Sequence, residues 1–235
     1  MTLLIASITP VIIFLYTIFK KDKNKEPLSL LAKCFLGGFA SIIITLIIDI
    51  PLIPIGESIS SPFFKSFFDA FFVAAIPEEL SKFVILYWLV WKSKYFDEYY
   101  DGIVYAIFVS LGFAMIENIF YVFEYGLGTA FIRAILAVPG HGFFAVFMGY
   151  FMSKAKFGTT VSKRSYLILS LLVPIALHGI YDFLIMYSVN LSEQYTLLIA
   201  LLLVTFTLFI IYLWRIGIQR IKASITQDIP IDNQN

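Results

Sequence analysis

Hydrophobic runs long enough to cross a lipid bilayer recur along almost the whole chain. Each holds about twenty residues, and a helix of that length spans a hydrocarbon core roughly 30 Å thick. Short segments rich in charged and turn-forming residues separate the runs and predict where each helix ends. We therefore predict an all-α bundle of about seven transmembrane helices, near residues 2–19, 30–50, 64–92, 101–123, 129–153, 165–188 and 194–214.

The links between these runs are too short to form a separate domain, and the chain shows no internal repeat. We predict a single membrane-embedded domain over residues 1–223 and a polar cytoplasmic tail over residues 224–235. The first run has no basic residues before it, and lysines follow it, which is the reverse of a cleaved signal peptide. We expect that run to remain as a helix.

Lysine and arginine gather at alternate ends of the predicted helices. They follow the first, third, fifth and seventh runs, whereas the loops around 51–62, 124–128 and 190–194 contain none. Loops rich in lysine and arginine face the cytoplasm in most membrane proteins. This pattern predicts an extracytoplasmic N-terminus and a cytoplasmic C-terminus.

The composition agrees with a membrane protein. Hydrophobic residues make up 60% of the chain and charged residues only 14%, where soluble domains carry about a quarter. The formal net charge of +1 argues against nucleic acid as a partner, because no dense basic surface is available to neutralise phosphates. The single cysteine, Cys34, has no second cysteine with which to form an internal disulfide bond.

Four of the apolar runs nevertheless contain ionisable side chains near their middle. A charged group at the centre of an isolated transmembrane helix costs at least about 2.5–3.5 kcal/mol, so it needs a partner or a function. These residues form four short motifs: Pro77-Glu78-Glu79-Leu80-Ser81-Lys82, Glu117-Asn118, Pro139-Gly140-His141-Gly142 and His178-Gly179-Ile180-Tyr181-Asp182.

The motifs lie at one depth in the predicted membrane. Counted at 1.5 Å per residue from the charged cytoplasmic end of each helix, Glu79 lies at about 20 Å, Glu117 at about 24 Å, His141 at about 20 Å and His178 at about 21 Å. Both histidines of the chain fall in this layer, somewhat beyond the midplane toward the outside. We expect the motifs to converge in one hydrated pocket, which helix bends at nearby prolines would help to open.

The spacing within two motifs predicts particular contacts. Glu78 and Lys82 are four residues apart in the favourable order, so one is the counter-ion of the other in the simplest interpretation, which leaves Glu79 unexplained. His178 and Asp182 are also one turn apart, an arrangement in which a carboxylate orients an imidazole.

Other polar residues have a plainer interpretation. Glu117 and Asn118 on their own are compatible with hydrogen bonding between helices. Asp49, Asp69 and Arg133 lie nearer the predicted outer ends, where we interpret them as structural or interfacial, and Asp69 is placed to pair with Arg133.

The four motifs, taken in order over residues 75–185, resemble the PrsW family of bacterial membrane proteases. The paired glutamates and two later helices with a histidine each are also similar to the wider superfamily of CAAX prenyl endopeptidases. The resemblance implies a multi-pass protease of the bacterial cell membrane that makes the site-1 cut in a single-pass anti-sigma factor. That cut begins regulated intramembrane proteolysis, which activates a sigma factor under envelope stress.

The resemblance also implies site residues. Glu78 and Glu79 match the essential acidic pair of the PrsW family, and Glu117, His141 and His178 match its other polar positions. Two positions depart from the CAAX enzymes. The basic residue Lys82 comes one position earlier than their arginine, and Glu117 stands where they have histidine, so their mechanism does not transfer directly.

Peptide hydrolysis needs an activated water, stabilisation of the oxyanion and a proton for the leaving amine. In our hypothesis one of Glu78 or Glu79 activates the water and a histidine stabilises the oxyanion, while Lys82 and Asp182 hold these groups in place. Pairing of Glu78 with Lys82 favours Glu79 as the base, whereas the CAAX analogy favours Glu78. Asn118 is a further supporting residue.

The cofactor is left open by the sequence. His141, His178 and Glu117 form one possible set of zinc ligands, although the chain lacks the HExxH motif. The main alternative function is a proton-coupled transporter or ion channel, because carboxylates and histidines at mid-depth also form ion relays. A catalytically silent membrane receptor or chaperone is a third interpretation.

Overall fold

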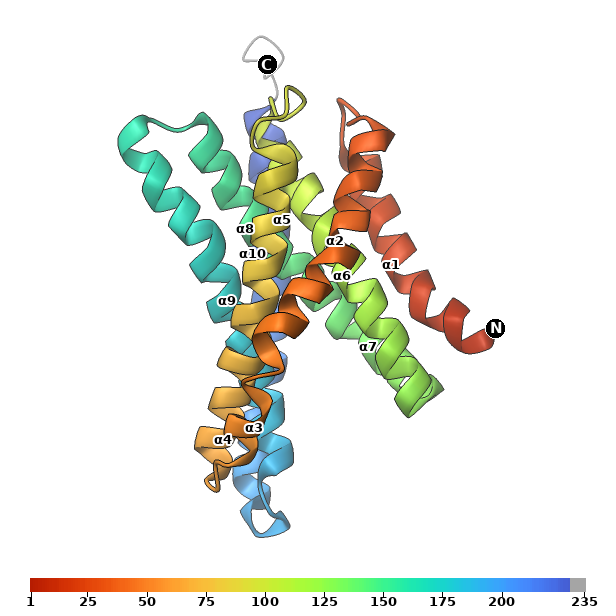
Figure 1. The fold of residues 1–235 in the computed structure, drawn as a ribbon, viewed down its shortest axis with the longest axis vertical. Helices are drawn as coiled ribbons and strands as arrows, with labels where there is room; N and C mark the ends of the chain where they lie inside the picture. Colours follow the sequence, from red (N-terminus) through yellow and green to blue (C-terminus); the bar gives the residue numbers. More distant parts are fainter. Residues whose placement is uncertain (229–235) are drawn as a thin grey trace.

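The computed structural model describes residues 1–228, apart from the side chain of Val161, and the regular secondary structure of this part of the chain is all helical (Figure 1). The elements in chain order are α1 (Thr2–Lys21), α2 (Leu28–Asp49), α3 (Ile53–Glu57), α4 (Pro62–Phe68), a π-helical segment (Asp69–Ala75), α5 (Ile76–Val90), α6 (Tyr99–Tyr125), α7 (Leu127–Ile135), α8 (Ala137–Phe157), α9 (Thr160–Asn190), a 3₁₀ turn (Glu193–Tyr195) and α10 (Thr196–Gln227).

The prediction of an all-α polytopic membrane bundle is confirmed. Within the described residues, six segments are long and apolar enough to cross a membrane: Thr2–Lys21, Leu28–Asp49, Tyr99–Tyr125, Leu127–Phe157, Ser162–Asn190 and Glu193–Gln227. The remaining run is helical too, over α4, the π-helical segment and α5. This run is not among the six apolar segments because Glu78, Glu79 and Lys82 interrupt its apolar sequence. A total of seven spans and the orientation of the termini stay predictions.

The last helix is longer than its sequence indicates. We expected it to end near residue 214, but α10 continues to Gln227 because Gly217, Ile221 and Ser224 remain on one buried face. The charged residues that follow Trp214 lie on the other faces of the helix and do not stop it. Part of the predicted tail, residues 224–227, is therefore helical, and residues 229–235 lie outside the described part of the chain.

Helix α6 lies at the centre of the bundle and packs against α1, α2, α5 and α8. Its approach to α8 is unusually close at Gly102 and Gly149. A Cβ atom on Gly149 would lie only 2.2 Å from the backbone oxygen of Gly102, so neither position has room for a side chain. Small residues allow transmembrane helices to approach in this way. The contact sets the register of the helices that carry Glu117 and His141.

Of the three prolines that precede the polar motifs, Pro77 and Pro139 coincide with breaks in regular α-helix, whereas α9 continues through Pro174. Pro77 cannot donate a backbone hydrogen bond to Val73, and the wider turns of the π-helical segment precede it directly. Pro139 likewise cannot donate to Ile135, which is the last residue of α7, and the chain turns at Leu136 before α8 begins. Both breaks lie beside the polar motifs.

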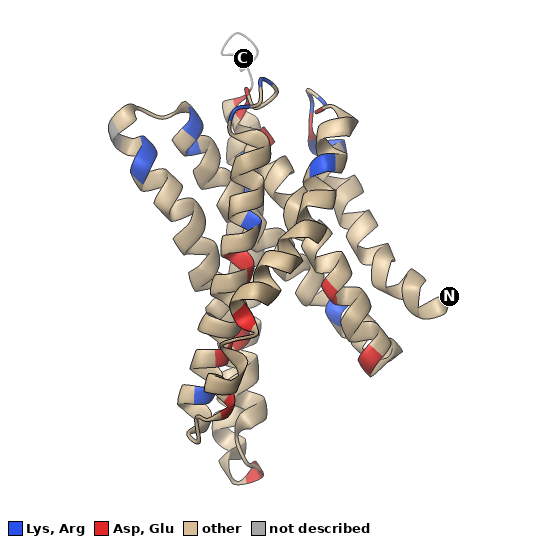
Figure 2. Ribbon diagram, in the orientation of Figure 1, with Lys and Arg blue, Asp and Glu red and all other residues tan. Residues whose placement is uncertain are grey.

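In Figure 1 the lower half of the molecule divides into two arms. One arm contains α3, α4, α9 and α10, and the other contains α7 with the C-terminal part of α6. Most lysine and arginine residues lie at the opposite, upper end in Figure 2. This end is the one that the loop charges predict to be cytoplasmic.

Candidate active site

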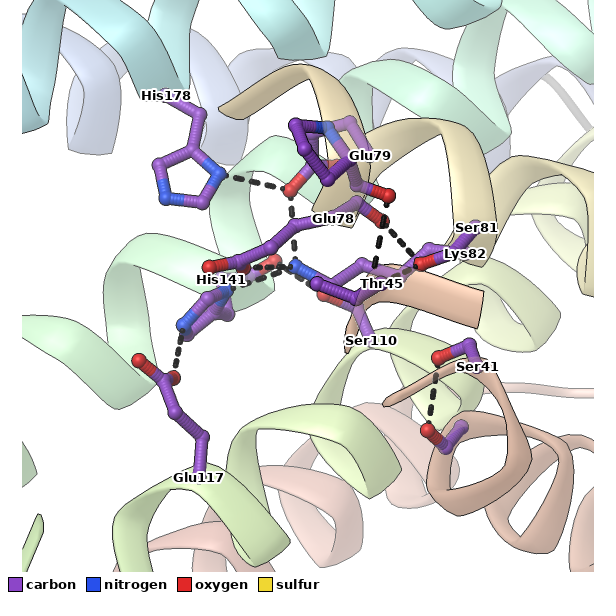
Figure 3. A network of polar contacts seen from close by, with 12 residues as sticks. Ser41, Thr45, Glu78, Glu79, Ser81, Lys82, Ser110, Glu117, His141 and His178 are labelled. Carbon is purple, nitrogen blue, oxygen red and sulfur yellow. Dashed lines mark hydrogen bonds and ion pairs between the residues drawn. The ribbon is translucent and has the colours of Figure 1, made fainter. Parts of the chain in front are cut away.

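Helix α5 places two glutamates around one lysine (Figure 3). Lys82 Nζ lies 2.9 Å from Glu78 Oε2 and 2.9 Å from Glu79 Oε1, because residues three and four apart share one face of a helix. The side chains of Lys82 and Glu79 are fully buried, whereas that of Glu78 is 12% exposed. The predicted pairing of Glu78 with Lys82 is confirmed, and the same ammonium group also neutralises Glu79.

Lys82 also connects α5 to α8 through His141. The lysine Nζ lies 3.2 Å from His141 Nδ1. An ammonium group only donates hydrogen bonds, so Nδ1 accepts and the ring hydrogen is on Nε2. That nitrogen donates to Glu117 Oε2 over 2.8 Å. His141 is thus held between a cation and an anion, with its tautomer determined by both.

His178 has a carboxylate on each side. Its Nδ1 lies 3.0 Å from Glu79 Oε1 and its Nε2 lies 3.2 Å from Asp182 Oδ2. An imidazole that donates to both carboxylates carries two N–H groups and a positive charge. Its ring stacks on Phe144, with centroids 4.8 Å apart. The predicted contact with Asp182 is confirmed, and the contact with Glu79 connects α9 to α5.

Arg133 also belongs to this cluster, which its position near the predicted outer end of a helix did not indicate. Its Nη2 lies 2.8 Å from Glu117 Oε2 and its Nε donates to Asn118 Oδ1 over 2.8 Å. The predicted pairing of Asp69 with Arg133 is wrong, because Asp69 pairs instead with Lys65, one turn earlier in α4. A signal was available in the sequence: Arg133 is the only charged residue in the run 129–153 and therefore needed a partner.

The remaining supporting residue, Asn118, is also in the cluster. Its side chain is fully buried, and besides accepting from Arg133 it donates to the backbone oxygen of Ser7 over 2.7 Å. The amide therefore connects α6 to α1 as well as to α7. Asn118 holds the arginine and does not face the cavity.

The cluster borders a cavity of about 240 Å³ at the junction of the two arms. Glu79 and Lys82 lie behind its wall. The polar residues that line it are Glu78, Glu117, Tyr121, Arg133, His141, His178, Tyr181 and Asp182, and they come from α5, α6, α7, α8 and α9. The four sequence motifs therefore do converge, as their common depth predicts.

The donor atoms are of the types that zinc prefers. One ligand atom each from Glu78, Glu79, His141 and His178 lies within 4.8 Å of the others. Imidazole nitrogens and carboxylate oxygens are common zinc ligands in hydrolases. These four residues fit a zinc ion by type and proximity. Glu117, which we named as a possible ligand, is not in this group, because it contacts the opposite nitrogen of His141.

Comparison with known proteins supports a membrane peptidase. The family described as PrsW family intramembrane metalloprotease matches residues 26–213, a range that contains all four motifs. "Protease PrsW" of Oceanobacillus iheyensis is 37% identical over 226 residues, which cover 95% of this chain and 96% of that protein. The corresponding figures are 40% over 186 residues, 79% and 80% for Geobacillus kaustophilus, and 34% over 220 residues, 93% and 94% for Bacillus subtilis.

No solved structure matches the chain. The family match and the relatives agree with the apolar helices in describing a multi-pass membrane protein of bacteria. They also agree on the reaction class, which is hydrolysis of peptide bonds. The chain belongs to the PrsW family of intramembrane proteases.

Proposed function

We propose that this protein makes the site-1 cut in a single-pass transmembrane anti-sigma factor, with water activated by Glu78. The substrate class rests on the resemblance of the four motifs to PrsW proteases that begin sigma-factor activation under envelope stress. The mechanism rests on one observation. Of the three charged residues on α5, only Glu78 lines the cavity, while Glu79 and Lys82 lie behind it.

This arrangement favours Glu78 over Glu79 as the general base. A base must reach the water that it deprotonates, and Glu79 is fully buried between Lys82 and His178. Glu79 is better suited to hold those two side chains in position. Lys82 orients both glutamates from the protein side, so the cavity-facing oxygen of Glu78 remains available to water.

The chemistry can be written with the chain's own residues. Glu78 removes a proton from water as the water oxygen bonds to the carbonyl carbon of the scissile peptide. His178, held through Nδ1 by Glu79, turns its Nε2–H from Asp182 to the resulting oxyanion. The C–N bond then breaks, and the proton on Glu78 passes to the departing amine. Glu117 and Arg133 form the opposite wall and hold His141 in place.

The family description names a metalloprotease, and the donors described above fit zinc. Glu79, His141 and His178 would hold the ion as three protein ligands, which leaves Glu78 as the base. His178 would have to give up its Nδ1 proton, and the Lys82 ammonium group would have to leave His141 Nδ1, because a ligating nitrogen needs a free lone pair. When bound, zinc supplies a lowered pKa for water and positive charge for the oxyanion. Chelation should abolish activity, and Zn²⁺ should restore it where Mg²⁺ does not. Undiminished activity in protein shown to be metal-free would rule zinc out.

Cleavage in cells tests the substrate class. Candidate single-pass anti-sigma factors should be co-expressed with the wild type and with alanine variants of each site residue, and a shortened product sought by immunoblot. We expect the product with the wild type and with Glu193→Gln, an exposed position outside the site. If all the alanine variants still yield the shortened product, the proposed protease mechanism is wrong. The variants to compare are Glu78→Ala, Glu79→Ala, Glu117→Ala, His141→Ala and His178→Ala.

The comparisons favour a peptidase over the transporter or channel that the intramembrane acids also suggested. Both functions need a polar cavity at mid-depth, so the cavity alone does not separate them. A transporter would be supported if purified protein in vesicles carried protons across the membrane and the Glu78→Gln variant did not. We expect no flux above that of empty vesicles.

A further inference from the structure

A second group of carboxylates lies at the lysine-rich end of the bundle. Glu26 lies just before α2, Asp97 lies just before α6, and Asp101 lies in the first turn of α6. One carboxylate oxygen from each lies within 4.8 Å of the other two. Sixteen residues of α6, or about 24 Å, separate Asp101 from Glu117, so this group is distinct from the candidate active site.

Asp101 is fully buried, and one of its oxygens has no partner. Its Oδ2 accepts hydrogen bonds from the backbone N–H of Asp97, at 3.0 Å, and of Glu98, at 2.7 Å. Its Oδ1 is buried without any hydrogen-bond donor. The carboxyl group of Glu26, which is only 6% exposed, contacts that of Asp101. Two carboxylates in contact repel each other unless a proton or a cation lies between them.

The described part of the chain provides no such cation. No lysine or arginine nitrogen in residues 1–228 lies within 4.0 Å of a side-chain oxygen of Glu26, Asp97 or Asp101. Lys25 is close in sequence, but its ammonium group donates to the backbone oxygens of Phe19 and Asp22.

The surroundings add negative charge. Asp22 is 3% exposed, and within residues 1–228 its carboxylate has no side-chain hydrogen-bond donor. Burial raises the pKa of Asp22 and of Glu26, and for Asp22 it outweighs the opposing effect of the nearby Lys25 ammonium group. Apart from its contact with Asp101, the side-chain hydrogen bond that Glu26 accepts within the described residues comes from the neutral hydroxyl group of Tyr105.

We propose that Glu26, Asp97 and Asp101 bind a divalent cation of the oxygen-preferring class, Mg²⁺ or Ca²⁺. The group offers carboxylate oxygens and no histidine or cysteine, which suits these ions better than zinc. Asp97 is exposed, so an ion has a route from solvent to the buried oxygen of Asp101.

The position of the site indicates what the ion does. It would join the α1–α2 connection, through Glu26, to the α5–α6 connection, through Asp97, and to the start of α6. The α5–α6 connection joins the helices that carry Glu78 and Glu117. The cation therefore acts as a structural clamp at the end of the bundle away from the chemistry, and it stabilises the packing of α6 without contacting the substrate.

The test uses the full-length protein in detergent after treatment with EDTA and gel filtration. Mn²⁺ binding is followed by electron paramagnetic resonance, with competition by Mg²⁺ and Ca²⁺, and thermal unfolding is measured with and without each ion. The variants are Glu26→Gln and Asp97→Asn, which keep the side-chain shape. Glu193→Gln, exposed in the α9–α10 connection, controls for loss of one charge, and Glu79→Gln controls for binding at the candidate active site.

We expect one Mn²⁺ per chain, displaced by Mg²⁺ or Ca²⁺, and a melting temperature about 5 °C higher with saturating ion. The affinity should fall at least tenfold in Glu26→Gln and Asp97→Asn and stay unchanged in Glu193→Gln. Loss of binding in Glu79→Gln alone, or wild-type affinity in Asp97→Asn, would overturn the proposal. Absence of ion binding in the wild type would do so too, and would indicate that a shared proton separates Glu26 from Asp101.

Discussion

Two groups of buried carboxylates lie near opposite ends of α6, and they differ in what neutralises them. At the candidate active site the chain supplies the positive charge, because Lys82 pairs with both glutamates of α5 and Arg133 pairs with Glu117. At the lysine-rich end, Glu26 and Asp101 are buried together, and no lysine or arginine of residues 1–228 forms an ion pair with them.

Burying a carboxylate costs several kcal/mol unless a counter-charge comes with it. A side chain that supplies the charge is always present and holds the acids in one arrangement, which suits groups that must stay aligned with a peptide bond. An ion from solvent is present only when its concentration allows. The comparison therefore predicts opposite effects on stability. Removal of a positive charge should destabilise the protein at the candidate active site, and removal of a carboxylate should stabilise the ion-free protein at the lysine-rich end.

The largest expected effect is loss of the base. Glu78→Gln should lower the turnover of purified protein by about 10²–10⁴-fold, because an amide cannot take a proton from water. Its melting temperature should stay close to that of the wild type, since Glu78 faces the cavity and Lys82 keeps its pairing with Glu79. Retained turnover in Glu78→Gln, combined with loss in a folded Glu79→Gln, would move the base to Glu79.

Removal of the lysine should be the most damaging change to stability. Lys82→Met leaves Glu78 without its cation and Glu79 with His178 alone, which should lower the free energy of unfolding by about 3–5 kcal/mol. Lys65→Met is the matched control, because Lys65 and Asp69 form a half-exposed pair with the same four-residue spacing. That control should cost less than about 1 kcal/mol in chemical unfolding. An equal loss of unfolding free energy in Lys82→Met and Lys65→Met would show that burial does not increase the cost of removing the lysine.

Arg133 should matter through the residues that it orients. Arg133→Gln should lower the turnover number by about 10–100-fold with little change in KM, because Glu117 would no longer hold His141 in place. Arg133→Lys should recover part of the turnover by keeping the charge. A rise in KM with an unchanged turnover number would show instead that Arg133 binds the substrate.

The smallest expected effect is an increase in the free energy of unfolding. In EDTA, Glu26→Gln should raise the free energy of unfolding by roughly 0.5–1 kcal/mol, because it removes one of two carboxylates that repel each other. With saturating Ca²⁺ or Mg²⁺ the wild type should become the more stable protein. Chemical unfolding in both buffers measures the reversal. A variant that is less stable in EDTA would mean that the charge on Glu26 is already satisfied within the fold.

The sequence by itself determined the features that depend on helix geometry. Twenty-residue apolar runs specify membrane helices, and a constant rise per residue places four motifs at one depth. Contacts within one helix could also be predicted from the sequence, since residues four apart share a face of the helix. The pairings of Glu78 with Lys82 and of His178 with Asp182 were predicted for this reason and are confirmed.

Tertiary structure alone decided how the helices are turned toward one another. The packing of the helices buries Glu79 and places Glu78 at the cavity. It also pairs Arg133 with Glu117 and brings Glu26 into contact with Asp101, which is 75 residues later in the chain. The physical reason is that helical spacing specifies relative angles within one helix, whereas the absolute rotation of each helix follows from packing. Close contacts such as that of α6 with α8 at their glycines set this rotation, and no local pattern encodes it.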